Sequence, residues 1–301
     1  MTAPGREDVD GVVLLDKPTG LTSNAALQRV RRLYRAASGG HAGTLDPLAS
    51  GLLPVALGQA AKFSQGLLEA DKEYLASVRL GVRTTTGDAE GEVIARLPVP
   101  PLGEDRLEAA LAGFRGEIDQ VPPMHSALKR DGRPLYEYAR RGETVERAPR
   151  RIAIYRLDLI AVAEDRVELR VRCSKGTYVR TLAEDIGSAL GCGAHLAGLR
   201  RTAVGGFRVE DAVGLAALEE GGPDLLRTAL RPVDILVEPL PRIDLDADAS
   251  ERLRHGQSVA APGALPAPAG LLRAYGPEGL FLGVVQADDG RVRPHRLMRT
   301  A

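Results

Sequence analysis

The amino-acid sequence predicts an α+β fold, with a mixed, largely antiparallel central sheet flanked by helices and a small β-rich C-terminal domain. Strand-like and helix-like patterns interleave, and several strands are adjacent in sequence, as at residues 152–162 and 167–173. This order favours a mixed sheet over a doubly wound parallel one. Near residue 240 the sequence pattern changes, because Pro239 and Pro241 interrupt it before a run of short strands. A chain of 301 residues suits about two domains.

The N-terminal elements follow from local patterns. Residues 1–10 are polar and are expected to be flexible. Residues 11–15 (GVVLL) form a short buried strand, and residues 16–20 (DKPTG) form the loop after it. Ser23 is the predicted N-cap of a helix over residues 24–34, since serine is a preferred residue at that position.

The middle of the chain contains the longest periodic patterns. A glycine-rich loop spans residues 39–51. Residues 74–80 alternate in polarity, which predicts a half-buried strand. A helical stripe follows within residues 107–114, and a further helix begins after Gly176 and ends at Gly191.

The C-terminal part reads as a separate unit. A Pro/Ala-rich loop occupies residues 261–270, and strand-like runs cover residues 271–275, 280–285 and 291–297. We therefore expect a main domain over residues 11–242 and a C-terminal domain over residues 243–301.

Composition excludes several classes of function. The 40 basic and 40 acidic residues balance, so net charge indicates no partner. The two cysteines form no CxxC pair and the five histidines are scattered, which predicts no metal site and buried reduced thiols in a cytoplasmic protein. No apolar run approaches the roughly 20 residues of a membrane span, and the N-terminus lacks a signal-peptide core.

The charge is uneven locally. Residues 126–156 contain nine basic and four acidic residues, with Tyr136 and Tyr138 among them. A basic stretch interleaved with aromatic residues fits a phosphate-binding surface. A solvated basic face fits this feature equally well.

One loop holds a single acid in a rigid frame. Asp46 follows Gly39, Gly40 and Gly43 and is fixed against Pro47, which restricts it to extended backbone geometry. A carboxylate can be held at the edge of a pocket in this way, although a Leu-Asp-Pro sequence alone is usually a turn. The order of residues does not match a nucleotide-phosphate loop.

Two further segments contain candidate residues. Tyr74 opens the strand after Asp71-Lys72-Glu73, where it either stacks on a base or packs in the core. Arg180 lies in the first turn of a predicted helix, where its charge opposes the helix dipole. It therefore needs an anionic partner. Asp185 offers a poor i+5 spacing, so a distant carboxylate is the sharper hypothesis.

Five ordered segments carry a family resemblance. They are DKPTGLTSN (16–24), GGHAGTLDPLASGLLP (39–54), DKEY (71–74), PPMHSALKRDGRPLYEYAR (122–140) and CSKGTYVRTLAEDIG (173–187). They resemble the signature segments of the tRNA pseudouridine-55 synthases, the TruB family, over nearly the whole chain. The resemblance implies a pseudouridine-synthase fold and a C-terminal domain similar to the PUA type. It also implies isomerisation of uridine-55 in the T-loop of tRNA by base flipping, without metal or cofactor. The enzyme would be a monomer that needs no protein partner.

The resemblance also implies roles for individual residues. Asp46 is the nucleophile, Arg180 pairs with it, and Tyr74 packs on the target uracil and handles the proton at C5. Residues 124–151 are the insertion that grips tRNA. The implied accessory roles fall to five residues. His41 fills the space beneath the T-loop, and Tyr178 and Leu199 line the pocket. Lys17 supports the active-site loop, and Asp88 is a polar neighbour of the site. Thr85 departs from many relatives, in which an acid is common.

Three other functions remain open at this point. A guide-RNA-dependent pseudouridylase subunit of the dyskerin type shares the aspartate loop, but residues 124–151 resemble the standalone enzymes. A non-catalytic tRNA-folding chaperone would not need Asp46, Tyr74 and Arg180 together. A nucleoside hydrolase would need an activated water and normally a second acid or a metal. The sequence also leaves open whether Asp46 attacks the uracil ring or the ribose carbon.

Overall fold

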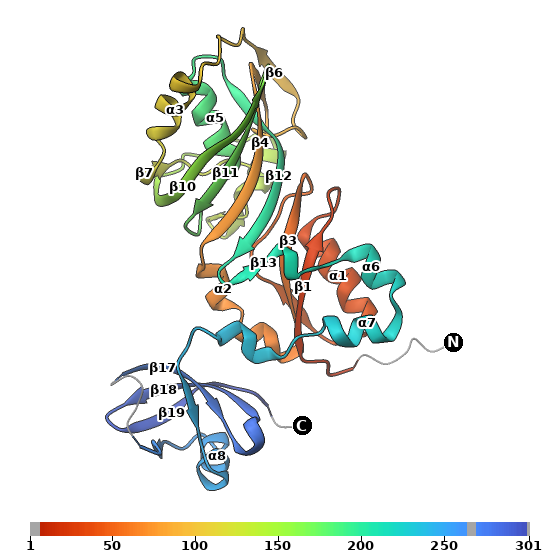
Figure 1. Ribbon diagram of the computed structural model, residues 1–301, viewed down its shortest axis with the longest axis vertical. Coiled ribbons are helices and arrows are strands. Elements are labelled where there is room, and N and C mark those ends of the chain that lie inside the picture. Colours follow the sequence, from red (N-terminus) through yellow and green to blue (C-terminus); the bar gives the residue numbers. More distant parts are fainter. Residues whose placement is uncertain (1–6, 264–268, 300–301) are drawn as a thin grey trace.

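The central feature of the computed structural model, which describes residues 7–263 and 269–299, is one large sheet shared by two lobes (Figure 1). The strands lie in the order β14-β1-β3-β12-β4-β11-β10-β7, with β13 paired to β12 and β2 to β3. Within the described residues, the β1–β14 and β3–β12 pairs are parallel and the other pairs of this sheet are antiparallel. This confirms the predicted mixed, largely antiparallel sheet. Its strands are β1 (Gly11–Lys17), β2 (Gly39–His41), β3 (Ala49–Leu57), β4 (Lys72–Leu80), β7 (Gly116–Gln120), β10 (Arg150–Ala163), β11 (Arg166–Cys173), β12 (Ala194–Val204), β13 (Phe207–Arg208) and β14 (Val213–Gly214).

Helices cover each lobe of the sheet. On one lobe lie α1 (Ser23–Leu33), α6 (Leu215–Glu220) and α7 (Gly222–Ala229), and on the other lie α3 (Glu104–Ala112) and α5 (Val179–Ala189) (Figure 1). The helical stripes predicted from sequence are confirmed at Leu107, Leu111, Leu182 and Ile186, which are buried on α3 and α5, whereas Phe114 lies beyond the end of α3. The short elements are α2 (Gln65–Glu69), α4 (Leu135–Arg140), the hairpin of β5 (Val82–Thr84) with β6 (Val93–Arg96), the 3-10 turns Gly58–Phe63, Val209–Asp211, Val233–Val237 and Pro277–Gly279, and the pair β8 (Lys129–Arg130) with β9 (Arg133–Pro134).

The strands β4 and β12 join the two lobes. They are neighbours along most of their length, from the Ala194–Leu80 pair to the Val204–Lys72 pair. Figure 1 shows both strands running from the upper lobe into the lower one. The parallel pairing of β12 with β3 then places the last residues of the glycine-rich segment, Ala49 to Gly51, beside the middle of β12.

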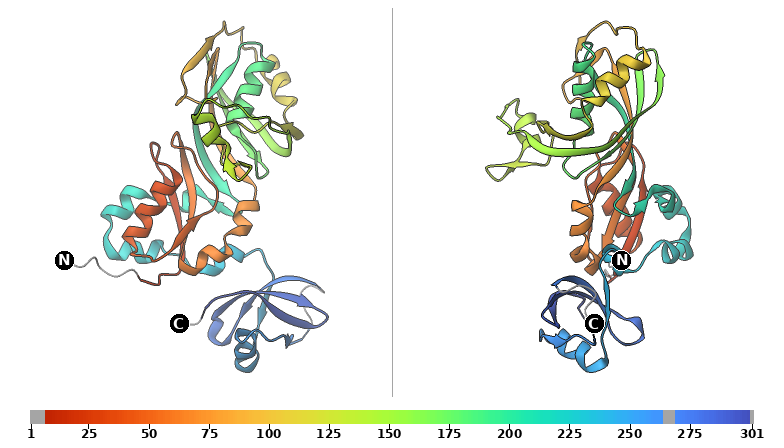
Figure 2. Two further views of the ribbon diagram at one scale, coloured as in Figure 1. Left: turned by 180° about the vertical axis from the view of Figure 1, so that it is seen from behind. Right: turned by 60° about the vertical axis from the view of Figure 1, so that its left-hand side comes forward.

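A long segment projects from the sheet between β7 and β10. We call residues 121–149 the arm; it contains β8, β9 and α4. In the right-hand view of Figure 2 this yellow-green segment stands out to the side of the upper lobe. It covers most of residues 124–151, the expected insertion, whose last two residues belong to β10.

The C-terminal domain is a five-stranded sheet in the order β15-β17-β18-β19-β16 with one helix, α8 (Ala247–Arg254). Its strands are β15 (Arg242–Asp244), β16 (Val259–Ala260), β17 (Ala269–Tyr275), β18 (Phe281–Asp288) and β19 (Arg291–Leu297). It has its own apolar cluster, but Val284 packs into a cluster with Phe63 and Leu236 of the main domain. The ring of Phe281 also meets Phe63 edge-on, with centroids 5.5 Å apart.

Three local expectations need comment. The predicted N-cap Ser23 is wrong: Thr22 caps α1 by accepting a 3.0 Å hydrogen bond from the Ala25 amide. Of the polar N-terminal residues, 1–6 lie outside the described part, whereas Glu7 bridges to Ala36 and Asp10 accepts a bond from the Gln59 amide. Residues 264–268 of the Pro/Ala-rich loop also lie outside the described part.

Candidate active site

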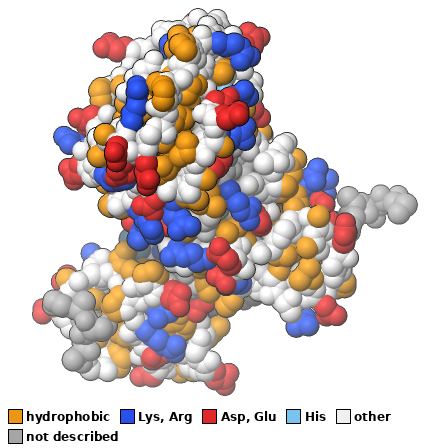
Figure 3. Space-filling model, turned by 45° about the horizontal axis from the view of Figure 1, so that its top comes forward, with side chains coloured by type: hydrophobic (Ala, Val, Ile, Leu, Met, Phe, Trp, Pro, Cys, Tyr) orange, Lys and Arg blue, Asp and Glu red, His pale blue; other side chains and the backbone are white. Residues whose placement is uncertain are grey.

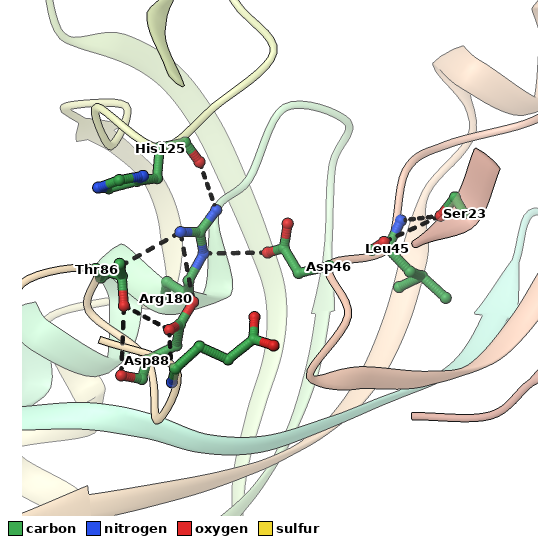
Figure 4. Close-up of polar contacts among 8 residues, drawn as sticks. Ser23, Leu45, Asp46, Thr86, Asp88, His125 and Arg180 are labelled. Atoms are coloured by element: carbon green, nitrogen blue, oxygen red, sulfur yellow. Dashed lines mark hydrogen bonds and ion pairs between the residues drawn. The ribbon is translucent and has the colours of Figure 1, made fainter. Parts of the chain in front are cut away.

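The loop between β2 and β3 holds Asp46 by contacts on both sides. Ser23 Oγ donates to the Leu45 carbonyl at 3.0 Å and accepts from the Leu45 amide at 2.7 Å (Figure 4). After Asp46, the Pro47 carbonyl accepts from the Gly20 amide at 2.8 Å. The backbone on either side of the carboxylate is therefore tied to the start of α1 and to the loop before it.

Arg180 is the partner of Asp46. Its Nε lies 3.1 Å from Asp46 Oδ2, and its Nη1 lies 3.5 Å from Asp88 Oδ2. Nη1 also donates to the Thr86 carbonyl at 3.3 Å, and Nη2 to the His125 carbonyl at 2.7 Å. Figure 4 shows these acceptors surrounding one guanidinium. The predicted distant carboxylate is confirmed, and Asp185 plays no part in these contacts.

The carboxylate is held on one side and open on the other. The Arg180 and Asp88 side chains are 8% and 4% exposed, whereas that of Asp46 is 42% exposed. Within the described residues, the ion pair of Asp46 involves Oδ2. The other oxygen thus remains available to a reacting atom of a bound molecule.

Opposing influences set the charge of the site. Burial raises the pKa of Asp46, Arg180 lowers it, and the nearby Asp88 raises it again; the net shift is upward. Burial also lowers the pKa of Lys17 to about 8, against the attraction of Asp46. Lys17 Nζ donates to the carbonyls of Pro18 and Leu21 at 2.8 and 2.7 Å. It therefore braces the loop after β1.

Two tyrosines lie close to this charge cluster. Tyr74 on β4 is 9% exposed, and burial raises its pKa, with Asp46 among the charges that act on it. Tyr178 directly precedes α5, and its amide donates to Gln120 Oε1 at 2.8 Å while its carbonyl accepts from Gln120 Nε2 at 3.1 Å. The charges of Asp46 and Arg180 also act on the Tyr178 hydroxyl.

The last two candidates lie on strands beside the loop. Leu199 on β12 is half-buried and pairs with Ala49 of β3 and Ala76 of β4. His41 ends β2; its buried Nδ1 has no hydrogen-bond partner among the described residues, and burial lowers its pKa. Direct contact with Asp46 is thus made by Arg180, while Asp88 reaches the cluster through Arg180.

Several residues of the site were not assigned to it from the sequence. The Ser23 hydroxyl and the Gln120 side-chain amide hold the Asp46 loop and Tyr178, whereas Thr86 and His125 hold Arg180 through their backbone carbonyls. Backbone carbonyls have no residue-type signature, so only the position of Thr86 and His125 in or beside the matched motifs pointed to them. Thr85 is exposed, and its hydroxyl accepts from the Glu92 amide at 3.1 Å, away from Arg180.

The described residues contain no cluster of three or more His, Cys, Asp or Glu side chains that could hold a metal ion. Cys173 and Cys192 are buried free thiols. Among the described helices, none has the length and apolar character needed to cross a membrane.

Comparison with known proteins places the chain in one family. Residues 31–179 match the TruB family pseudouridylate synthase (N terminal domain). Residues 180–238 match the tRNA pseudouridylate synthase B C-terminal domain, and residues 241–298 the Pseudouridine synthase II TruB, C-terminal. The tRNA pseudouridine synthase B of Aromatoleum aromaticum is 58% identical over 98% of this chain and 94% of its own. That of Ralstonia pickettii is 55% identical over 98% of this chain and 96% of its own.

Solved structures show the same fold. A chain of an H/ACA ribonucleoprotein bound to a substrate RNA containing 2'-deoxyuridine aligns with a TM-score of 0.72 at 27% identity, over 96% of this chain and 85% of that one. A chain of a Cbf5-Nop10-Gar1 complex aligns with a TM-score of 0.71 at 29% identity, over 97% and 84%. With relatives above 50% identity along nearly its whole length and a shared architecture, the chain belongs to the TruB family of pseudouridylate synthases and has the pseudouridine-synthase fold.

Proposed function

We propose that this protein is a tRNA pseudouridine synthase that isomerises uridine-55 in the T-loop, with Asp46 as the nucleophile. The observation that carries the proposal is the half-open carboxylate of Asp46, held through Oδ2 by the buried Arg180, in a member of the TruB family. Curated relatives with 54–58% identity are named tRNA pseudouridine synthase B, which supports tRNA as the substrate.

The reaction needs few groups. The N1–C1′ bond breaks, the uracil turns, and a C5–C1′ bond forms; C5 loses a proton and N1 gains one, so atoms and electrons balance without a redox partner. Asp46 forms a transient covalent bond to the uracil ring or stabilises and captures the ribose carbon, and either route uses an ionised carboxylate. Tyr74 is the group we assign to the C5 proton.

The target base must leave the folded T-loop to reach Asp46. Enzymes that act on a base extrude it from its stack into a pocket. Tyr178 and Leu199 supply the aromatic and aliphatic walls of this pocket, and His41 fills the place that the base vacates. Water is excluded by these side chains while the uracil is detached.

The arm is the proposed grip on the RNA. Most of the basic residues of the 126–156 stretch lie on it, including Lys129, Arg133 and Arg140, and all three are exposed. Figure 3 shows Lys and Arg side chains gathered near the middle of one face, on a molecule whose total charge is balanced. Localised positive charge of this kind suits RNA phosphates.

The experiment combines the purified protein with an unmodified tRNA transcript or its isolated T-arm stem-loop, in EDTA and without other RNA. Pseudouridine and free uracil are measured, with a transcript carrying cytidine at the target position as the control. We expect stoichiometric pseudouridine from both substrates. Dependence on a second RNA would instead identify a guide-dependent subunit, release of free uracil a hydrolase, and binding without conversion a chaperone.

A further inference from the structure

The largest fully buried side chain among the described residues is that of an arginine, Arg201, which is 1% exposed. It lies on β12 in the middle of the central sheet, paired with Gly51 of β3 on one side and Tyr74 of β4 on the other. A Cβ atom on Gly51 would come within 2.2 Å of the Arg201 carbonyl oxygen, so the backbones approach very closely here. The position of Arg201 is therefore tightly constrained.

The guanidinium of Arg201 connects three segments. Nε donates to the Leu52 carbonyl at 2.8 Å, and Nη2 donates to the Gly43 carbonyl at 3.1 Å. A side-chain hydrogen bond joins it to the phenol of Tyr74. Gly43 has a φ of +88°, and a Cβ there would lie 3.2 Å from Nη1, so this loop is moulded onto the guanidinium.

The charge of Arg201 has no carboxylate partner within residues 7–263 and 269–299, since its acceptors there are two carbonyls and a phenol. The next residue is different: Arg200 grips both oxygens of Asp16, at 3.0 and 2.7 Å. Burying a cation without a counter-charge is costly, and a merely structural role would be met at lower cost by an apolar side chain.

The neighbours of Arg201 are the groups that matter for the proposed reaction. Burial lowers the pKa values of Lys17 and His41, and the charge of Arg201 lowers them further. For Tyr74, burial raises the pKa and Arg201 opposes that rise. The buried cation thus favours the ionised form of the phenol.

We propose that Arg201 is a positioning residue of the reaction: one rigid guanidinium fixes the Gly43 carbonyl of the Asp46 loop and the Tyr74 phenol in a common frame. This inference rests on the proposed function. The planar fork lets Arg201 serve several acceptors at set angles, which the single ammonium of a lysine does not. The carboxylate and the aromatic group that act on the uracil consequently keep a constant separation.

The test uses Arg201→Lys and Arg201→Gln, with Arg200→Lys and Arg200→Gln as matched controls on the same strand. Circular dichroism and melting give the folded fraction, filter binding gives the Kd for the T-arm, and quenched-flow gives the single-turnover rate per folded molecule. We expect both Arg201 variants to lose about 100-fold in rate with Kd within about threefold of wild type. The Arg200 variants should stay within about threefold in rate.

Equal rates per folded molecule in wild type and either Arg201 variant would overturn the proposal, as would a loss confined to Kd. Should both variants fail to fold, Gly43→Ala becomes the test, because a Cβ there lies 3.2 Å from Nη1 and displaces the loop from the guanidinium. Gly191→Ala is its control, since Gly191 has a similar φ of +79° but no neighbouring atom within 4 Å of an added Cβ. A decrease of at least tenfold in rate at unchanged Kd is expected, and a wild-type rate would overturn the proposal. Failure of the wild type to form any pseudouridine refutes the proposed function instead, so the two failures are distinguishable.

Discussion

At the scale of single residues, the site depends on how one carboxylate is balanced between solvent and a buried cation. The pKa of Asp46 lies above its ordinary value because of burial, although Arg180 opposes this shift. A raised folded-state pKa means that ionised Asp46 costs stability: its contribution is favourable at low pH and is lost as pH rises through the folded pKa. The ionised carboxylate of Asp46 therefore lowers the stability of the fold and is retained for the reaction.

We expect Asp46→Asn to abolish pseudouridine formation, to below about 0.1% of the wild-type single-turnover rate, because the nucleophile is removed. Binding of the T-arm should be unchanged, and the melting temperature at neutral pH should be no lower than that of wild type. Asp165→Asn, which breaks the exposed pair with Arg79, is the matched control and should keep full activity. An active Asp46→Asn protein would refute the assigned nucleophile.

The pH dependence should report the same balance. As pH falls through the raised pKa of Asp46, the carboxylate is protonated and the single-turnover rate drops. Asp88→Asn removes a neighbouring negative charge that raises this pKa, so the acid limb of the profile should move to lower pH. Rates from pH 4.5 to 8 for both proteins give the check. A limb that stays in place, or moves upward, would contradict the coupling.

Arg180→Lys should slow single turnover by about 100-fold or more with little change in Kd. A lysine can supply the charge, but it cannot bind Asp46, Asp88 and the Thr86 and His125 carbonyls at once. Arg79→Lys, at an exposed ion pair, serves as the control for the substitution itself. Wild-type turnover in Arg180→Lys would rule out this geometry as a requirement.

At the scale of elements, the periodicity of apolar residues correctly predicted the strands and helices that bury one face. The alternation of residues 74–80 yielded β4, and the stripes containing Leu107 and Leu182 yielded α3 and α5. The misplaced charge of Arg180 led to a distant carboxylate. What failed was the choice between adjacent hydroxyl residues at the start of α1, since Thr22 and Ser23 both suit an N-cap and only the tertiary contact with Leu45 separates them.

These two hydroxyls allow a paired experiment. Thr22→Ala removes the cap of α1 and should cost about 1 kcal/mol of stability with the rate per folded molecule unchanged. Ser23→Ala leaves the Leu45 amide and carbonyl without their buried partner, which should cost about 1–3 kcal/mol and also slow turnover, because the Asp46 loop loses a tether. Denaturant unfolding and single-turnover rates distinguish the two. Equal activity in both variants would show that the tether is dispensable.

At the scale of the whole molecule, the C-terminal domain both covers the main domain and presents charge. Phe281 and Val284 pack over Phe63 and Leu236, and the Lys62 ammonium donates to the Leu297 carbonyl at 3.5 Å. This contact could not be predicted from the sequence, because it depends on how the two domains pack together and not on the pattern of apolar residues in either one.

Deleting the residues after Leu240 should therefore lower the melting temperature by several degrees, because apolar side chains such as Phe63 become exposed. Affinity for full tRNA should fall while the single-turnover rate on a bound T-arm remains. Arg293→Glu in the full chain tests affinity without this loss of cover, since Arg293 is exposed on β19. We expect weaker binding and a shallower salt dependence, and an unchanged Kd at every salt concentration would exclude a role for Arg293 in binding.

The contacts of Arg180 have a consequence for how such a sequence can diverge. One guanidinium touches the loop of Asp46, the turn at Thr86–Asp88 and, through His125, the arm. Mutations in these three segments act on a shared partner, so their effects should not add. A substitution in the arm therefore determines which substitutions the other two segments tolerate. The three segments should evolve together, although more than 70 residues separate Asp46 from His125.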